Sequence, residues 1–306
     1  MRILVTGATG FIGTAISRYL SSQGHSVVCL VRNLPAELVD RADYRVVPDI
    51  LSVTAQDIEG VEVVIHTAGV AHGKNGHDRQ LFETNVDGSL AVCRASIDAH
   101  CKKLILLSST KAVGEGNLSN QSLPRPVGPY AQSKRQSETE LLDLCAHAEM
   151  ELVCLRIPVT YGVGVAANFK KLISLTRSYA PIPYGLFASR KSYLYVKNLA
   201  RFVERILTQP EIDGHCLFVT DPEPIELGCL LRELRLAQGL WAAPAIPMPV
   251  NLMRKIMKSV LPSSIYIQLF EDAVIDISET QALINWVPSW TTENALKDMF
   301  GPDDEP

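Results

Sequence analysis

Short apolar runs alternate with longer amphipathic stretches through the first half of the chain. The apolar runs are rich in Val, Ile and Leu without period-two alternation, which is typical of strands covered on both faces of a parallel sheet. They predict strands at Arg2–Thr6, Ser26–Val31, Tyr44–Val47, Val61–Thr67, Lys103–Ser108 and Leu152–Ile157. The amphipathic stretches predict helices at Ile12–Gln23, Asp78–His100 and Pro129–Glu149. This repetition indicates right-handed crossovers and a doubly wound α/β sheet.

The pattern changes after about residue 158, where prolines become frequent and the elements less regular. Helices are predicted there at Phe169–Tyr179, Val196–Thr208 and Ile225–Gln238. The basic amphipathic stretch Val250–Leu261 predicts a further packed helix. We therefore expect a first domain covering residues 1–165 together with 192–213. A smaller second domain, covering 166–191 and 214–306, would pack over the carboxyl edge of the sheet.

Composition excludes several classes of protein. The 306 residues carry 29 Lys and Arg against 33 Asp and Glu, which leaves no general basic field for a nucleic acid. No stretch reaches the ~18 uninterrupted apolar residues of a membrane span. The seven cysteines are odd in number and form no C-x-x-C pair, and the histidines show no ligand spacing. We expect reduced thiols, no metal site and, since a secretory signal has no room, a soluble cytoplasmic protein.

A glycine-rich turn follows the first predicted strand and leads at once into a helix. Glycines allow backbone N–H groups to approach a pyrophosphate closely, and the helix N-terminus adds partial positive charge. In this strand–turn–helix context the turn predicts a dinucleotide site. Its residues are Gly7, Thr9, Gly10, Phe11, Ile12 and Gly13.

The ends of the next two strands bear on which dinucleotide is bound. Enzymes that use NAD usually carry Asp or Glu after the second strand, whereas an arginine suits the 2′-phosphate of NADP. The chain has Val31-Arg32 there, which favours NADP over NAD. Asp49 and Ile50 follow the third strand, where the adenine would lie, although Asp49 could equally cap a turn.

A serine, a tyrosine and a lysine form the second chemical motif. Ser108-Ser109 ends the fifth predicted strand, at the sheet edge where ligands bind. Tyr130 and Lys134 share one face of the following helix. A lysine ammonium beside a phenol favours the phenolate, so a group that titrates near ~10 can exchange protons near neutral pH. We predict that Ser109, Tyr130 and Lys134 are catalytic, with Ser109 holding a substrate oxygen.

Together these motifs resemble the extended short-chain dehydrogenase/reductases of the NAD-dependent epimerase/dehydratase type. The resemblance covers nearly the whole chain, including His66-Thr67-Ala68-Gly69, Asn85-Val86-Asp87-Gly88 and Arg156–Gly162. It implies a Rossmann dinucleotide-binding domain, a nucleotide-sugar-binding C-terminal region and hydride transfer at a sugar carbon. It also makes Tyr130 the acid/base and gives Lys134 a contact to the nicotinamide ribose. Further cofactor contacts are implied for Thr67, Ala68, Gly69, Asn85, Ser108 and Pro158.

The residues after Ser109 narrow the reaction. Relatives that remove water at carbons 4 and 6 carry an Asp-Glu pair there, and the 3,5-epimerase/reductases carry a cysteine. This chain has Thr110-Lys111, which leaves redox at one carbon. The run Ser108–Gly116 is also similar to bacterial polysaccharide enzymes that act on UDP-N-acetyl-6-deoxyhexoses. That similarity implies substrate contacts from Ser109, Thr110, Lys111, Asn168, Tyr184, Arg190 and Lys191, the last two clamping the diphosphate.

These observations favour a reductase of the 4-keto group of a UDP-4-keto-6-deoxy-N-acetylhexosamine, in the synthesis of a surface-polysaccharide precursor. The cofactor would be NADP or NAD, with NADP favoured. The alternative is an NAD-dependent 4-epimerase of a UDP-hexose or UDP-N-acetylhexosamine. The resemblance also implies a homodimer formed through Asp78–His100 and Pro129–Glu149.

Overall fold

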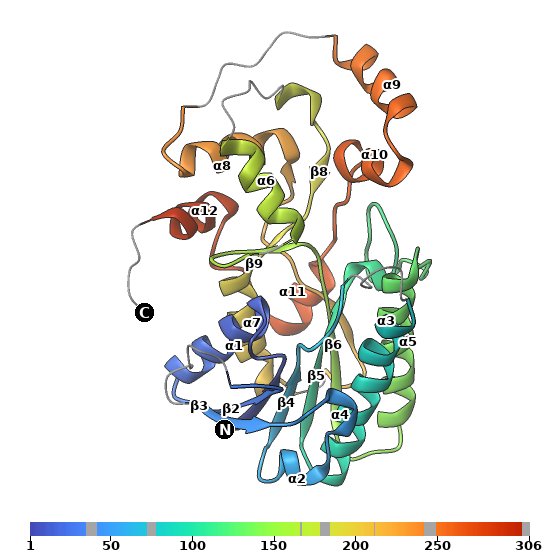
Figure 1. Ribbon diagram of the computed structural model, residues 1–306, viewed down its shortest axis with the longest axis vertical. Coiled ribbons are helices and arrows are strands. Elements are labelled where there is room, and N and C mark those ends of the chain that lie inside the picture. The colour runs from blue at the N-terminus through green and yellow to red at the C-terminus, as the bar shows by residue number, and fades with distance from the viewer. Residues whose placement is uncertain are drawn as a thin grey trace.

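Seven parallel strands form the central sheet, in the order β10-β6-β5-β4-β1-β2-β3 (Figure 1). The computed structural model describes residues 1–34, 42–71, 78–165, 167–177, 184–210, 212–241 and 249–301, with only the backbone at Ala167, Asn168, Asn251 and Ser264. The strands are β1 Arg2–Thr6, β2 Ser26–Val31, β3 Ala42–Val46, β4 Val63–His66, β5 Lys103–Ser109, β6 Glu151–Ile157 and β10 Cys216–Phe218. The order reverses between β1 and β4, and such a reversal opens a crevice at the carboxyl edge. The predicted doubly wound α/β sheet is confirmed.

Helices cover both faces of this sheet (Figure 1). On one face lie α1 Phe11–Ser22 and α7 Val196–Leu207; on the other lie α3 Asp78–Phe82, α4 Gly88–Asp98 and α5 Pro129–Cys145. In β1, Ile3 and Val5 belong to the core shared with α1 and α7, whereas Leu4 belongs to the core shared with α4 and α5. Successive strand residues thus enter opposite apolar cores. This explains why the strands read as unbroken apolar runs.

The predicted helix Asp78–His100 is not one continuous α-helix. Between α3 and α4, residues Glu83–Asp87 form a turn of π-helix, η3. Such a turn holds one extra residue, changes the direction of the side chains that follow, and frequently marks a functional site. The buried Asn85 lies within it. The expected dimer through α3–α4 and α5 stays a prediction.

A second region lies beyond the carboxyl edge of the sheet, in the upper half of Figure 1. Its helices are α6 Ala167–Arg177, α8 Leu227–Ala237, α9 Val250–Val260, α10 Ser263–Phe270 and α12 Thr292–Phe300, and α11 Ser278–Ile284 packs nearer the sheet. Two small sheets pair β7 Thr160–Tyr161 with β9 Leu194–Tyr195, and β8 Arg190–Lys191 with β11 Ile225–Glu226. Its core is aromatic, with Tyr161 stacked on Phe169 at 5.0 Å between ring centroids.

The boundary between the two parts differs in one place from the expected division. Strand β10 pairs with β6 and therefore completes the large sheet, although the sequence pattern assigns residues from 214 onward to the second domain. The remainder of that division stays a prediction. Among the described helices, none has the length and apolar character needed to cross a bilayer.

Candidate active site

The glycine turn packs directly against the segment that follows β4. Gly7 has φ +67°, and a Cβ at this position would lie 2.7 Å from the backbone nitrogen of Ala68. A Cβ on Gly13 would lie 2.3 Å from the carbonyl oxygen of Gly7. The Thr67 hydroxyl donates to the carbonyl of Thr6 at 2.7 Å. The structure thus brings together predicted cofactor residues from two strands and leaves no space there for larger side chains.

The turn opens helix α1 in a way that suits an anion. The N-cap residue is Gly10, which provides no side-chain cap, and the first turn of α1 contains no acidic residue. The first N–H groups of a helix lack intrahelical acceptors and carry partial positive charge. Phe11 packs against the aromatic core of the second region, and Ile12 packs against the sheet core. The residues present therefore fit a dinucleotide pyrophosphate.

The residues predicted to determine whether NAD or NADP binds follow strands β2 and β3. Arg32 is exposed directly after β2. The Asp49 carboxylate accepts from the backbone N–H of Leu51 at 3.2 Å and caps the short helix η1 Ile50–Ser52. Of the two interpretations for Asp49, the structure displays the turn cap. Ile50 fills the space beside Gly88, where a Cβ would lie 2.7 Å from its Cγ2 atom.

The serine, tyrosine and lysine meet at the end of β5. Helix α5 begins with Pro129, whose fixed φ suits a first helical position, and this places Tyr130 in the first turn. The hydroxyl of Tyr130 is hydrogen-bonded to Ser109. Lys134 lies one turn further and donates from Nζ to the carbonyl of Leu107 at 2.9 Å. A Cβ at Gly69 would lie 3.2 Å from this Nζ, so the segment after β4 also reaches the site.

Burial dominates the electrostatics of both catalytic side chains. It raises the pKa of Tyr130, an effect partly offset by the hydrogen bond from Ser109. It lowers the pKa of Lys134 to about 8, against the opposing influence of the Glu138 carboxylate. In this structure the Lys134 ammonium donates to the carbonyl of Leu107, and the expectation that it lowers the pKa of Tyr130 stays a prediction.

Asn85 connects the cofactor side of the site to helix α5. Its Oδ1 accepts from Val70 N at 2.8 Å, and its Nδ2 donates to Val70 O at 2.9 Å and to Ser133 Oγ at 3.0 Å. Ser133 in turn donates to the carbonyl of Tyr130 at 2.9 Å. Its amide thus holds the loop after β4 against the start of α5, and the cofactor contact expected of Asn85 stays a prediction.

The residues predicted to contact the substrate lie in different parts of the structure. Thr110 is buried directly after Ser109, and Lys111 forms an ion pair with Glu115. Tyr184 is buried, and among the described residues its hydroxyl has no hydrogen-bond partner. The side chain of Asn168 lies outside the described residues.

The two residues predicted to clamp the diphosphate, Arg190 and Lys191, have different surroundings. Arg190 is exposed on β8, and its backbone N–H donates to Asp272 at 2.8 Å. The ammonium of Lys191, by contrast, donates to the carbonyls of Ile267 and Glu271 at the end of α10. A lysine at a helix C-terminus satisfies carbonyls that lack intrahelical partners. Lys191 thus anchors α10, and the clamping of a diphosphate by Arg190 and Lys191 stays a prediction.

Sequence reasoning missed two buried polar groups beside the site. Glu138 lies one turn after Lys134, fully buried, and forms an ion pair with Arg156 at 2.8 Å. His66 bridges Thr6 Oγ1 at 2.7 Å and Ser89 Oγ at 3.0 Å, and burial lowers its pKa to about 3, so the ring is neutral. The four-residue spacing Tyr130–Lys134–Glu138 was the available signal for Glu138.

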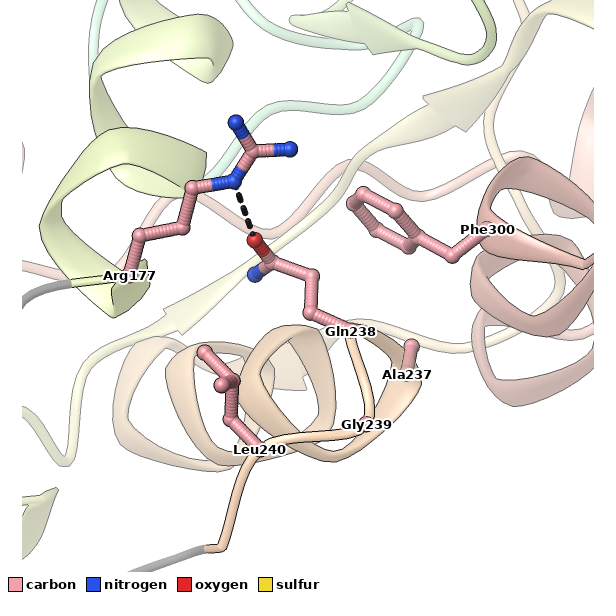
Figure 2. Close-up of a pocket in the computed structure, with 6 residues that line it drawn as sticks. All are labelled: Arg177, Ala237, Gln238, Gly239, Leu240 and Phe300. Carbon is pink, nitrogen blue, oxygen red and sulfur yellow. Dashed lines mark hydrogen bonds between the residues drawn. The ribbon is translucent and has the colours of Figure 1, made fainter.

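A cavity of about 590 Å³ lies elsewhere, at the ends of α6, α8 and α12. Figure 2 shows its lining, where Arg177 donates to the Gln238 side chain at 2.8 Å and Phe300 faces them from α12. None of the predicted site residues lines it. It is therefore separate from the serine–tyrosine–lysine site.

Comparison with known proteins agrees with this geometry. Residues 3–218 match the model of the NAD dependent epimerase/dehydratase family. The chain belongs to this family. Among curated relatives, the UDP-glucose 4-epimerase of Vibrio cholerae is 28% identical over 96% of this chain and 93% of its own length. The resemblance to extended short-chain dehydrogenase/reductases is thus confirmed, and the chain is an NAD-dependent enzyme of this family.

Solved structures share the fold over almost the entire chain. The UDP-glucuronic acid 4-epimerase of Bacillus cereus, in complex with NAD, has a TM-score of 0.78 at 21% identity, covering 98% of this chain and 97% of its own. The UDP-glucose 4-epimerase of Thermotoga maritima, with UDP-glucose, has a TM-score of 0.76 at 21% identity and equal coverage. The cofactor bound in the first is NAD. The preference for NADP inferred from Arg32 finds no support in these comparisons.

Replacing Tyr130 with Phe should abolish turnover while NAD still binds. The substitution removes the hydroxyl that exchanges the proton and keeps the ring that fills the site, so we expect a loss of at least about 10²-fold in kcat. The measurement pairs steady-state turnover with a titration of NAD binding by protein fluorescence. Turnover at the wild-type rate would disprove the assignment, and a Tyr44→Phe variant controls for loss of a hydroxyl elsewhere.

Proposed function

We propose that this chain is a 4-epimerase of a UDP-sugar that retains its NAD through the reaction cycle. The site at the end of β5, where Tyr130 is hydrogen-bonded to Ser109 beside the buried Lys134, supports redox chemistry at a sugar carbon. The observation that favours epimerisation over simple reduction is the similarity to a 4-epimerase over almost the entire chain. Bound NAD supplies a hydride acceptor that becomes the donor in the return step. Tyr130 takes the proton of the C4 hydroxyl during oxidation and returns it during reduction, while Ser109 orients the oxygen.

The neighbouring positions support redox chemistry at a single carbon. Removal of water from a sugar requires a second acid and base, and Thr110 and Lys111 occupy the positions where relatives carry that pair. Thr110 offers a hydroxyl, and the ammonium of Lys111 is paired with Glu115. The similarity to the 4-epimerase of Vibrio cholerae over 96% of this chain supports epimerisation in particular.

The nucleotide end of the substrate would lie in the second region. Tyr184 provides a buried hydroxyl without a partner among the described residues, and Arg190 provides an exposed guanidinium on β8. A planar guanidinium suits a diphosphate because it can donate two parallel hydrogen bonds. We propose that these two residues contact the UDP group.

One observation favours a second candidate, the reductase of a UDP-4-keto-6-deoxy-N-acetylhexosamine. A one-way reductase must exchange its dinucleotide in every cycle, which suits the reduced NADP pool of a cell. The end of β2 carries the exposed Arg32 and no carboxylate, an arrangement that can accommodate a 2′-phosphate.

The two candidates predict different outcomes in one assay. The purified protein, without added cofactor, should interconvert UDP-glucose with UDP-galactose or UDP-GlcNAc with UDP-GalNAc, followed by chromatography of the nucleotide sugars. In parallel, a UDP-4-keto-6-deoxy-N-acetylhexosamine is supplied with NADPH or NADH and the nicotinamide absorbance is recorded. Stoichiometric oxidation of NADPH without any interconversion would refute the epimerase and establish the reductase.

Arg32→Asp tests how the dinucleotide is chosen. A carboxylate repels a 2′-phosphate and accepts from a ribose hydroxyl, so the ratio of the Kd values should move toward NAD by about tenfold or more. Calorimetric titration of both dinucleotides into each variant measures this ratio. Arg232→Asp, on the exposed side of α8, makes the same charge change away from the turn. A ratio equal to that of the wild type means that Arg32 does not contact the dinucleotide.

A further inference from the structure

Glu138 is a fully buried carboxylate with no place in the chemistry described so far. It lies on α5 one turn after Lys134 and two turns after Tyr130, so the three side chains share one helical face. A buried charge is strongly unfavourable unless it is paired and hydrogen-bonded. Its partners therefore indicate what it does.

Both carboxylate oxygens of Glu138 are bonded to neighbouring strands. Oε1 accepts from Ser108 Oγ at 2.6 Å and from Arg156 Nε at 3.0 Å. Oε2 accepts from Arg156 Nη2 at 2.8 Å and lies 3.3 Å from Arg135 Nη1. Ser108 belongs to β5 and Arg156 to β6, so one side chain fixes the middle of α5 to two adjacent strands. The Arg156 guanidinium also lies 5.6 Å from the ring centroid of Phe218 on β10.

Lys134 is anchored to the same part of β5. Its Nζ donates to the carbonyl of Leu107, the residue before Ser108. Lys134 and Glu138 thus hold successive residues of one strand from successive turns of one helix. A displacement of Glu138 would shift the helical turn that carries the catalytic ammonium.

Charged and titratable groups face Lys134 from several elements. Glu138 on α5, Cys154 on β6 and His66 on β4 interact electrostatically with it. Tyr130 lies one turn earlier on α5, and Arg156 on β6 is paired with Glu138. His66 is neutral because burial lowers its pKa to about 3, and the pKa of Cys154 is raised far above its ordinary value by its hydrogen bond with Cys216 and by burial. Among these described groups, Glu138 is the carboxylate, and it forms an ion pair with Arg156 at 2.8 Å.

We propose that Glu138 is a positioning residue for the catalytic lysine. Its carboxylate holds the Tyr130–Lys134 face of α5 against β5 and β6, and its negative charge favours the charged form of Lys134. The expected effect of Glu138 variants on enzyme turnover rests on the proposed function, whereas their expected effect on the titration of Lys134 does not.

The direction of the pKa shifts agrees with this role. Burial lowers the pKa of Lys134 to about 8, and the nearby carboxylate of Glu138 opposes that shift. The ammonium is present below the pKa and lost above it. Removing the charge of Glu138 lowers the pKa further, so Lys134 loses its proton at a lower pH. Removing the positive charge of Arg156 should raise the pKa of Lys134, because the negative charge of Glu138 is then no longer paired with that guanidinium.

The test titrates Lys134 directly in the full-length protein, without a sugar. Protein with 13C-labelled lysine is titrated by NMR, and the Lys134 signal is assigned by its absence in Lys134→Arg. In Glu138→Gln the midpoint should fall by about one pH unit or more. In Glu138→Asp it should stay nearer the wild-type value, and in Arg156→Gln it should rise. Asp143→Asn, an equal charge change on the exposed side of α5, should leave it unchanged.

Equal midpoints in wild type and in folded Glu138→Gln would overturn the proposal. If Glu138→Gln does not fold, the test is the midpoint of the Lys134 titration in Arg156→Gln, which should rise. An unchanged or lower midpoint in that variant would refute the proposal. The alkaline limb of kcat/KM should follow the NMR midpoint in each variant that turns over a UDP-sugar. An inactive protein in which Lys134 shifts as expected would contradict the proposed function and leave the role of Glu138 standing.

Discussion

The cofactor turn and the catalytic helix depend on one narrow contact, the segment Thr67–Gly69 that lies between them. On one side, a Cβ at Gly7 would lie 2.7 Å from the nitrogen of Ala68; on the other, a Cβ at Gly69 would lie 3.2 Å from the ammonium nitrogen of Lys134. The approach at Gly7 is too close for a larger side chain, because it is made to backbone, and the one at Gly69 brings the backbone against the end of the Lys134 side chain. The segment after β4 therefore contacts both the glycine turn and the lysine of α5, at the point where the strand order reverses.

Buried polar groups then hold this arrangement in a single conformation. Asn85 satisfies its amide with Val70 and Ser133, and Glu138 satisfies its carboxylate with Ser108 and Arg156. The bonds of Glu138 join α5 to β5 and β6, and those of Asn85 join the π-helical turn both to the loop after β4 and to α5. A buried polar group that loses its partner costs about 1–3 kcal/mol, and a buried charge costs more. Alternative positions of α5 would break several such bonds at once, which keeps the tyrosine and the lysine aligned with the strand ends.

Local patterns predicted the parts of the structure that depend on local physics. The apolar strands, the glycine turn and the spacing of Tyr130 and Lys134 were all readable, since each follows from periodicity or from backbone freedom. The π-helical turn at Glu83–Asp87 was not, because the extra residue is stabilised by contacts from Asn85 to distant segments. The pairing of Lys191 with α10, and that of Glu138 with Arg156, likewise join residues 76 and 18 positions apart. A charged side chain in a sequence does not reveal whether a ligand or another part of the protein will neutralise it.

The catalytic end of the site is equally suited to an epimerase and to a reductase, so the difference must arise elsewhere. Tyr130 and Ser109 are held in place by α5 and β5, so in the proposed reaction they meet the sugar carbon from one direction. A proton donor and a hydride source that stay in place can invert that carbon only if the keto sugar rotates between oxidation and reduction. It must then present its opposite face to the hydride source. The nucleotide must then stay bound while the sugar is released from its contacts. This requirement falls on the groups that hold the diphosphate and the base, a role that we propose for Arg190 and Tyr184, rather than on those that hold the sugar. A reductase has two different requirements: its sugar stays in one orientation, and its dinucleotide leaves after each cycle. The exposed position of Arg32 bears only on the binding of the dinucleotide.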